Sequence, residues 1–152
     1  GRRVEVEIDF ADPIIGRQLY AADVTPSLFR SEMAPARTFG FRHEEEAMRN
    51  MGLIRGAMPA NCIVLTREGI ENPPLRYPDE FVRHKVLDLI GDLALLGKRI
   101  QGRVVADRAG HAMHTALVSR LLKDHSLWEE STAEHAEEPA PLPASAPLFD
   151  PA

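Results

Sequence analysis

Three side chains that can bind a metal ion or carry a proton recur at a spacing of four residues between positions 81 and 96. They are His84, Asp88 and Asp92, and most of their neighbours are apolar, which predicts a helix buried on nearly every side. Residues four apart share one face of a helix, so the three side chains should form a single stripe. Buried acids need a partner, and the stripe therefore indicates a cation or a hydrogen-bond network beside it.

His84 and Asp88 have the types and spacing expected of two ligands of a zinc ion, because an imidazole nitrogen and a carboxylate oxygen at i, i+4 converge. A catalytic zinc ion usually has three protein ligands and a water molecule. A third ligand must then come from elsewhere in the chain or from a partner. The same spacing also fits a simple histidine–aspartate pair with Asp92 in solvent.

A second candidate lies at Gly110-His111, where the last helix is expected to begin. The positive end of the helix dipole and a flexible glycine would allow a ligand to approach His111 closely. His114, three residues further on, is a possible co-ligand. Histidines at helix starts are also common as surface or capping residues, so both interpretations stay open.

The elements that must position these residues follow from the apolar periodicity, the turn residues and the helix stop signals. Residues 37–65 predict a compact β-α-β unit, and residues 79–96 a long helix ended by Gly97. Mixed elements with several short strands favour an α+β two-layer sandwich, with a sheet packed on helices, over a doubly wound sheet. The expected strands are 3–10, 18–24, 37–41, 61–65 and 100–106, and the expected helices are 25–33, 44–51, 79–96 and 110–122.

Length and composition set further limits. The 152 residues suit one domain, and no apolar run approaches the roughly 18 residues of a membrane span. The single cysteine, Cys62, excludes a disulfide framework and fits a cytoplasmic location. The chain opens at Gly1 without an initiator methionine or a signal-peptide pattern, so we expect a piece of a longer protein.

The charge is unevenly distributed. Residues 125–152 contain six acidic residues, no Lys or Arg and five of the twelve prolines, which predicts a disordered acidic tail. The remaining 18 basic and 17 acidic residues nearly cancel. A body without a basic stripe argues against a nucleic-acid-binding domain.

Three separated motifs carry a further signal. They are Ala36-Arg37-Thr38-Phe39-Gly40-Phe41, the run Phe81-Val82-Arg83-His84-Lys85-Val86-Leu87-Asp88-Leu89-Ile90-Gly91-Asp92-Leu93, and Gly110-His111-Ala112. Together they resemble the UDP-3-O-acyl-N-acetylglucosamine deacetylases, which act in lipid A synthesis. The resemblance runs from about Val4 to Leu122.

The resemblance implies a role for each matching residue. His84 and Asp88 would bind Zn²⁺, while Asp92 would orient His111, a protonated histidine that stabilises the oxyanion or protonates the leaving amine. Thr38 would help to hold the oxyanion. Such roles suit amide hydrolysis, in which zinc activates water and an acid protonates the amine.

The resemblance also implies substrate contacts. Lys85 and Phe39 would contact the sugar and nucleotide portions, and the insert at 37–65 would form a passage for the acyl chain. The candidate lining residues are Met48, Met51, Ile54 and Met58, which could equally be ordinary core. The implied fold is ribosomal protein S5 domain 2-like.

The family's remaining zinc ligand, a histidine, and its glutamate general base belong to an amino-terminal domain that has no counterpart in these residues. Residues 1–124 would then be the second domain of a hydrolase that removes the N-acetyl group of the substrate and releases acetate. The isolated chain is expected to bind zinc weakly and to be inactive. The alternative is a non-catalytic module that binds a metal or an acyl chain.

Overall fold

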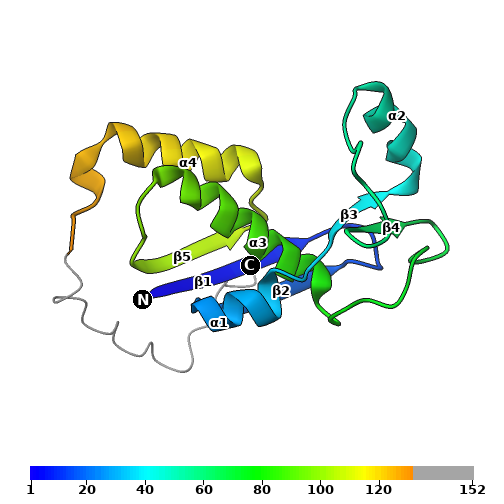
Figure 1. Cartoon of the computed structure of the whole chain (residues 1–152), viewed down its shortest axis with the longest axis horizontal. Helices are drawn as coiled ribbons and strands as arrows, with labels where there is room; N and C mark the ends of the chain where they lie inside the picture. The colour runs from blue at the N-terminus through cyan, green and yellow to red at the C-terminus, as the bar shows by residue number, and fades with distance from the viewer. Residues whose placement is uncertain (132–152) are drawn as a thin grey trace.

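The computed structural model describes residues 1–131 and contains two small β-sheets with helices (Figure 1). The larger sheet consists of β1 (Arg2–Asp9), β2 (Arg17–Asp23) and β5 (Gly102–Asp107), in the order β2-β1-β5. The smaller sheet pairs β3 (Thr38–Phe41) with β4 (Cys62–Leu65). The mixed arrangement confirms the expected α+β class.

The central strand of the larger sheet is β1, which pairs antiparallel with β2 and parallel with β5. Val4, Val6 and Ile8 of β1 are at most 3% exposed and belong to the main core. This core also contains the apolar side chains of α3 (Glu80–Leu93), which packs against the sheet. The sheet therefore holds α3 in a fixed position, and the candidate stripe is carried on this helix.

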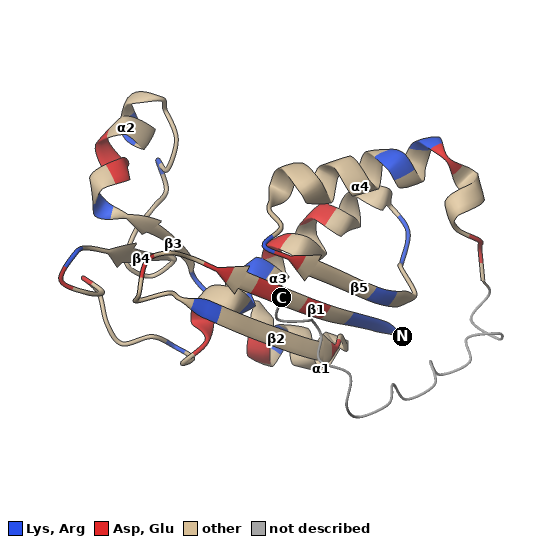
Figure 2. Cartoon of the chain, turned by 180° about the vertical axis from the view of Figure 1, so that it is seen from behind, with Lys and Arg blue, Asp and Glu red and all other residues tan. Residues whose placement is uncertain are grey.

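The alternation in β1 predicts a strand with one solvent-exposed face, but Glu5 and Glu7 are only 2% and 6% exposed. Arginines of the flanking strands cover them: Arg103 Nη2 lies 2.6 Å from Glu5 Oε2, and Arg17 Nε lies 2.5 Å from Glu7 Oε1. Figure 2 shows this acidic stretch along β1. The expectation of a solvated face was wrong because it ignored cross-strand partners.

The helix α3 is buried on one side only, which corrects the expectation of burial on nearly every side. Its buried apolar residues are Phe81, Val82, Val86, Leu89, Ile90 and Leu93. His84, Asp88 and Asp92 are half-buried on another face, and Leu95 beyond the helix is 64% exposed. A 3₁₀ turn, Ala94–Leu96, follows, and Gly97 ends it with a left-handed φ of 68°, as the sequence predicts.

The last helix, α4 (His111–Lys123), packs alongside α3 and contributes Val118 to the core (Figure 1). A 3₁₀ turn, His125–Leu127, follows it, and the Trp128 indole donates to the Leu121 carbonyl. Most of the predicted tail, residues 132–152, lies outside the described residues.

The expected β-α-β unit is present and extends away from the sheet as a separate arm (Figure 1). Strands β3 (Thr38–Phe41) and β4 (Cys62–Leu65) are parallel, with Thr38 opposite Cys62. A 3₁₀ turn, Arg42–Glu44, and α2 (Glu45–Asn50) connect them. We call residues 38–65 the arm.

The first helical segment begins as predicted, because the Thr25 hydroxyl accepts from the Leu28 amide at 3.1 Å. It consists of α1 (Pro26–Leu28) and a π-helical turn, Phe29–Met33. Met33 is fully buried. This segment packs beside α3 and leads directly to Arg37, the residue before the arm.

Candidate active site

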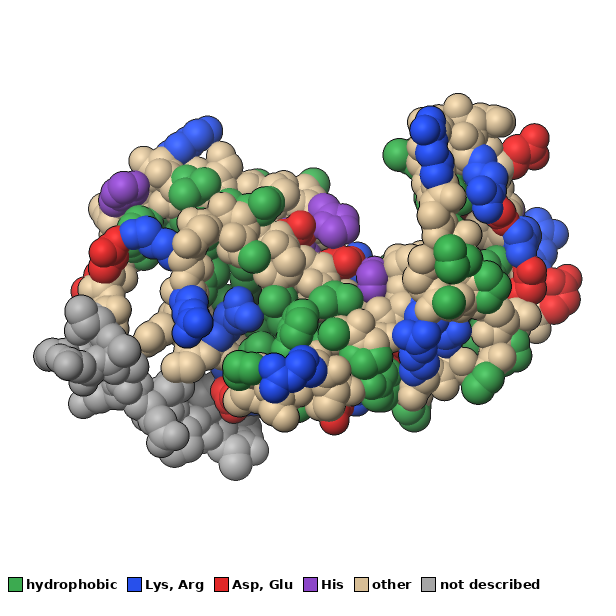
Figure 3. Space-filling view, viewed as in Figure 1, with side chains coloured by type: hydrophobic (Ala, Val, Ile, Leu, Met, Phe, Trp, Pro, Cys, Tyr) green, Lys and Arg blue, Asp and Glu red, His purple; other side chains and the backbone are tan. Residues whose placement is uncertain are grey.

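The predicted stripe on α3 and the predicted histidine of α4 meet in space. His111 Nδ1 lies 2.7 Å from Asp92 Oδ2, and His111 Nε2 lies 3.8 Å from Asp88 Oδ2. In the space-filling view, histidine and acidic side chains gather beside the hollow between the helices and the arm (Figure 3). Two helices thus place four titratable groups within one small region.

His84 and Asp88 lie next to each other, as their spacing predicts. His84 Nε2 is 3.3 Å from Asp88 Oδ1, and Lys85 Nζ is 2.9 Å from Asp88 Oδ2. Burial lowers the pKa of His84, and the neighbouring cations Lys85 and His111 lower it further against the opposing effects of Asp88 and the Ala36 backbone. His84 is therefore neutral near pH 7, the form that binds a metal.

The second nitrogen of the His84 ring, Nδ1, is buried, and the ring interacts with the Ala36 backbone, although no hydrogen bond of Nδ1 meets normal geometry. The Nε2 atom is the one that lies next to Asp88, at 3.3 Å. Nε2 is therefore the atom of this ring that could bind a metal ion together with Asp88.

Asp92 is held by two histidines. His111 Nδ1 and His114 Nδ1 lie 2.7 Å and 2.8 Å from the same oxygen, Asp92 Oδ2. Burial would raise the pKa of Asp92, but the hydrogen bonds from His114 and His111 outweigh it and lower the pKa. Asp92 is thus a carboxylate acceptor, which fixes the proton on Nδ1 of each ring.

The residues offer two places for a metal ion. A tetrahedral zinc ion with bonds of about 2.0–2.1 Å separates two ligand atoms by roughly 3.3–3.4 Å, and the His84–Asp88 distance of 3.3 Å agrees. Asp92, His111 and His114 also have ligand atoms within 4.8 Å of one another. Their separations of 2.7 and 2.8 Å are hydrogen-bond lengths, too short for two ligands of one ion, so His84 and Asp88 fit a metal better.

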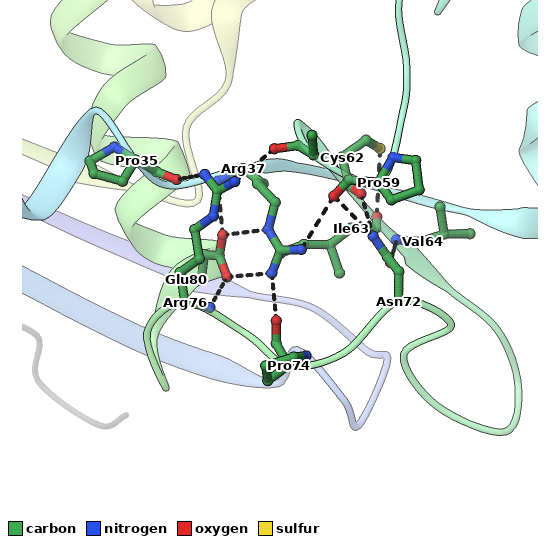
Figure 4. A network of polar contacts seen from close by, with 11 residues as sticks. Pro35, Arg37, Pro59, Cys62, Ile63, Val64, Asn72, Pro74, Arg76 and Glu80 are labelled. Carbon is green, nitrogen blue, oxygen red and sulfur yellow. Dashed lines mark hydrogen bonds and ion pairs between the residues drawn. The ribbon is translucent and has the colours of Figure 1, made fainter.

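Thr38 and Phe39 are positioned by a buried network at the base of the arm (Figure 4). Glu80, which is fully buried at the start of α3, accepts from the backbone amide of Arg37 at 3.0 Å and from its guanidinium at 2.9 and 3.0 Å. The backbone amide of Arg76 donates to the same carboxylate at 2.6 Å. Because Thr38 follows Arg37 directly, the network fixes the start of β3 against α3.

Phe39 packs beside the candidate metal ligand. Its ring makes edge-on contacts with Phe10, Phe81 and His84 at centroid distances of 5.6, 5.1 and 6.1 Å. Phe39 therefore both joins the arm to the body and contacts the His84 ring, which aromatic packing of this kind stabilises.

The arm encloses a cavity of about 390 Å³. Thr38, Phe39, Met48, Ile54 and Met58 contribute to its lining, whereas Met51 lies outside it and is 67% exposed. Cys62, the strand partner of Thr38, also lines the cavity, and burial raises the pKa of its thiol. Phe39 therefore both lines the cavity and contacts the His84 ring.

A family model for UDP-3-O-acyl N-acetylglycosamine deacetylase (LpxC) matches residues 1–123. The chain belongs to this family. The match covers every residue of the site described above and confirms the resemblance inferred from the three motifs.

Curated relatives in the deacetylase family agree. The UDP-3-O-acyl-N-acetylglucosamine deacetylase of Solibacter usitatus is 53% identical over 128 residues, which are 84% of this chain and 43% of the relative. The protein of the same name from Nitratidesulfovibrio vulgaris is 46% identical over 132 residues, 86% of this chain and 42% of the relative. The chain spans about two fifths of the length of these relatives. Among residues 1–131, no helix is long and apolar enough to cross a membrane.

Two sets of contacts in this deacetylase-family site are not predicted by the sequence. His114 was considered a co-ligand, whereas it bonds to Asp92; the i, i+3 spacing from His111 was the available signal. The Arg37–Glu80 network gave no local signal, because its two residues are 43 positions apart.

Proposed function

We propose that this chain forms part of a zinc-dependent deacetylase that hydrolyses the N-acetyl group of UDP-3-O-acyl-N-acetylglucosamine and releases acetate, a step of lipid A biosynthesis. The family membership and the names of the relatives support this substrate. The observation that carries the proposal is the His111–Asp92 hydrogen bond of 2.7 Å directly beside the His84–Asp88 pair. An acid and a metal-binding pair are thus adjacent.

His84 and Asp88 would hold the zinc ion, which, when bound, supplies an activated water and polarises the acetamide carbonyl. A neutral His84 offers its Nε2 lone pair, and Asp88 offers its Oδ1 oxygen. Lys85 Nζ lies 2.9 Å from Asp88 Oδ2 and orients that carboxylate.

His111 would act as the acid that protonates the leaving amine and as a cation near the oxyanion. Asp92 accepts a hydrogen bond from the Nδ1–H of His111, which leaves Nε2 facing Asp88, 3.8 Å from its Oδ2. A carboxylate behind an imidazole fixes the direction of the ring. Thr38, exposed at the start of β3, would donate its hydroxyl to the oxyanion.

The substrate would lie across the hollow between body and arm. Lys85 and Phe39 would contact its sugar and nucleotide portions, and the arm, within the insert at residues 37–65, would receive the acyl chain. Met48 and Ile54 line the cavity there, and flexible or branched apolar side chains suit a fatty acyl group.

Residues outside this sequence would complete the enzyme by supplying a third zinc ligand and the general base. Residues 1–124 would form one domain of the complete protein, with a ribosomal protein S5 domain 2-like arrangement. Alone, this chain would bind zinc weakly and release no acetate. The reaction would take place in the cytoplasm.

The test compares the complete protein that carries this sequence with the chain alone. We expect the complete protein to bind about one zinc ion per chain and to release acetate from the substrate. A chelator should abolish the activity, and added zinc should restore it. Undiminished acetate release by the chelated protein, with its zinc removed, would exclude the metal mechanism.

A second candidate function is supported by the cavity. The arm encloses about 390 Å³ with Met48, Ile54 and Met58 in its wall, and this space needs no metal. The chain could then be a non-catalytic module that binds acyl groups. Fatty-acid binding by the complete protein without any acetate release would favour this function.

A further inference from the structure

The family-derived roles leave one buried histidine unused. His114 is 4% exposed, lies one turn along α4 from His111, and has Nδ1 2.8 Å from Asp92 Oδ2. The two imidazole rings are 6.3 Å apart at an angle of 78°, so they approach Asp92 from different directions. A titratable side chain buried against the proposed acid–carboxylate pair needs a physical reason.

The geometry argues against a third ligand role for His114. Its Nδ1 and that of His111 both lie at hydrogen-bond distance from a single oxygen, and an ionised aspartate can only accept. Both rings therefore carry a proton on Nδ1, the atom that a metal at this point would need. The arrangement is a carboxylate clamped by two donors.

A clamp of this kind has a mechanical effect. The Asp92 side chain is 16% exposed, and a hydrogen bond to the 65%-exposed His111 alone would leave both side chains free to turn together. His114 is held in the interface of α3 and α4, so its bond gives Asp92 an anchor that solvent does not reach.

We propose that His114 is a positioning residue: by fixing Asp92, it sets the direction of the His111 ring toward Asp88. The proposal rests on the proposed function, in which His111 acts as the acid. His114 itself contacts no reacting atom; it acts only through Asp92.

The experiment uses the complete protein with His114→Leu and His114→Asn. Leucine removes the donor, while the asparagine Nδ2 amide occupies the topological place of imidazole Nδ1 and can donate to Asp92. We expect His114→Leu to lower kcat by about 10 to 100 fold, with KM and zinc content nearly unchanged. His114→Asn should recover most of the lost kcat.

A matched control is Val118→Ala, which shortens another buried residue of α4, 4% exposed, without touching Asp92. It should lower thermal stability as His114→Leu does and leave kcat close to that of the unaltered protein. An equal fall in kcat for Val118→Ala and both His114 variants would mean that helix packing alone matters, and would overturn the proposal.

A second readout does not depend on activity. In ¹⁵N-histidine spectra the His111 Nδ1 proton should be protected from solvent exchange in the unaltered protein, exchange faster in His114→Leu and recover in His114→Asn. If the complete protein releases no acetate but the His111 signal responds in this way, the positioning survives and the proposed function fails.

Two further outcomes would overturn the proposal. The first is an unchanged His111 signal together with unchanged kcat in His114→Leu. The second is the loss of a bound zinc equivalent in His114→Leu and His114→Asn, which would make Asp92, His111 and His114 a metal site instead.

Discussion

The first turn of α3, at Glu80, and the stripe that begins at His84 both hold charged groups in partly apolar surroundings, but the contacts of these groups differ. At the first turn, Glu80 is fully buried and every polar contact comes from within the chain, through the Arg37 side chain and two backbone amides. Further along the helix, His84 Nε2 lies 3.3 Å from Asp88, and Asp88 also contacts Lys85 and His111.

The difference separates structure from function on one helix. A buried charge whose bonds are all satisfied stabilises a fixed geometry, and here it fastens the arm to the body. An imidazole nitrogen and a carboxylate oxygen that lie side by side are suited to bind a metal ion. The Glu80 network thus positions Thr38 and Phe39, and the His84–Asp88 pair is where we propose that the metal binds.

The largest expected effect comes from Asp88→Ala in the complete protein, which changes the His84–Asp88 pair. This removes a proposed zinc ligand, so bound zinc should fall to a trace and acetate release should stop. Zinc is measured by atomic absorption and acetate release by a coupled assay. Full zinc content in this variant would move the metal away from His84 and Asp88.

Glu80→Gln breaks the ion pair between Glu80 and Arg37 and should mainly affect the stability of the fold. The amide keeps the volume but leaves the Arg37 guanidinium buried without its counter-ion, which costs about 3–5 kcal/mol. Urea unfolding of the chain measures this loss. The matched control is Glu45→Gln, which breaks the exposed i, i+4 pair with Arg49 and should leave the unfolding midpoint nearly unchanged. Equal midpoint shifts in the two variants would contradict the role given to the network.

Asp92→Ala tests whether Asp92 has a different role from the proposed zinc ligand Asp88. Asp92 is proposed to orient His111 and not to bind zinc, so zinc content should be retained while kcat falls by about 10 to 100 fold. Asp88→Ala serves as the comparison, because it should lose both. Equal zinc loss in Asp88→Ala and Asp92→Ala would reverse the assignment of roles.

The same contrast explains what the sequence could predict. The His84, Asp88 and Asp92 stripe, the Gly97 stop and the β-α-β unit follow from local periodicity and spacing, and the structure has all of them. Partners distant in sequence could not be inferred. Gln18 Oε1, for example, accepts from the Val82 amide near the start of α3 at 3.2 Å, although the two residues are 64 positions apart.

The sequence also does not predict the burial of charged side chains that are paired with residues of other strands. Glu5 and Glu7 read as solvent-facing residues because a strand pattern records polarity and not the arginines of neighbouring strands. The hydrogen bond of His114 to Asp92 could not be inferred, because Asp92 lies on another helix. Helix and strand signals are local, while satisfaction of charge is a property of the whole fold.

The smallest expected effect is a change of stability with pH, which further tests the role of the Glu80 network. Burial would raise the pKa of Glu80, but hydrogen bonds from Arg37 and Arg76 lower it; the Arg103 hydrogen bond is the main cause of the lowered pKa of Glu5. A carboxylate with a lowered pKa in the folded state binds fewer protons than in the unfolded state. Its stabilisation is therefore complete above the unfolded pKa, about 4.5, and is lost as pH falls through the lower folded value.

The free energy of unfolding of the chain should consequently decrease from about pH 5 downward, and urea midpoints measured at successive pH values follow it. Glu80→Gln lacks one of the responsible carboxylates, so its midpoint should fall less steeply over that interval than that of the unaltered chain. A slope in Glu80→Gln equal to that of the unaltered chain would mean that Glu80 is protonated equally in the folded and unfolded states, and the ion pair with Arg37 could not then be the interaction that fastens the arm to α3.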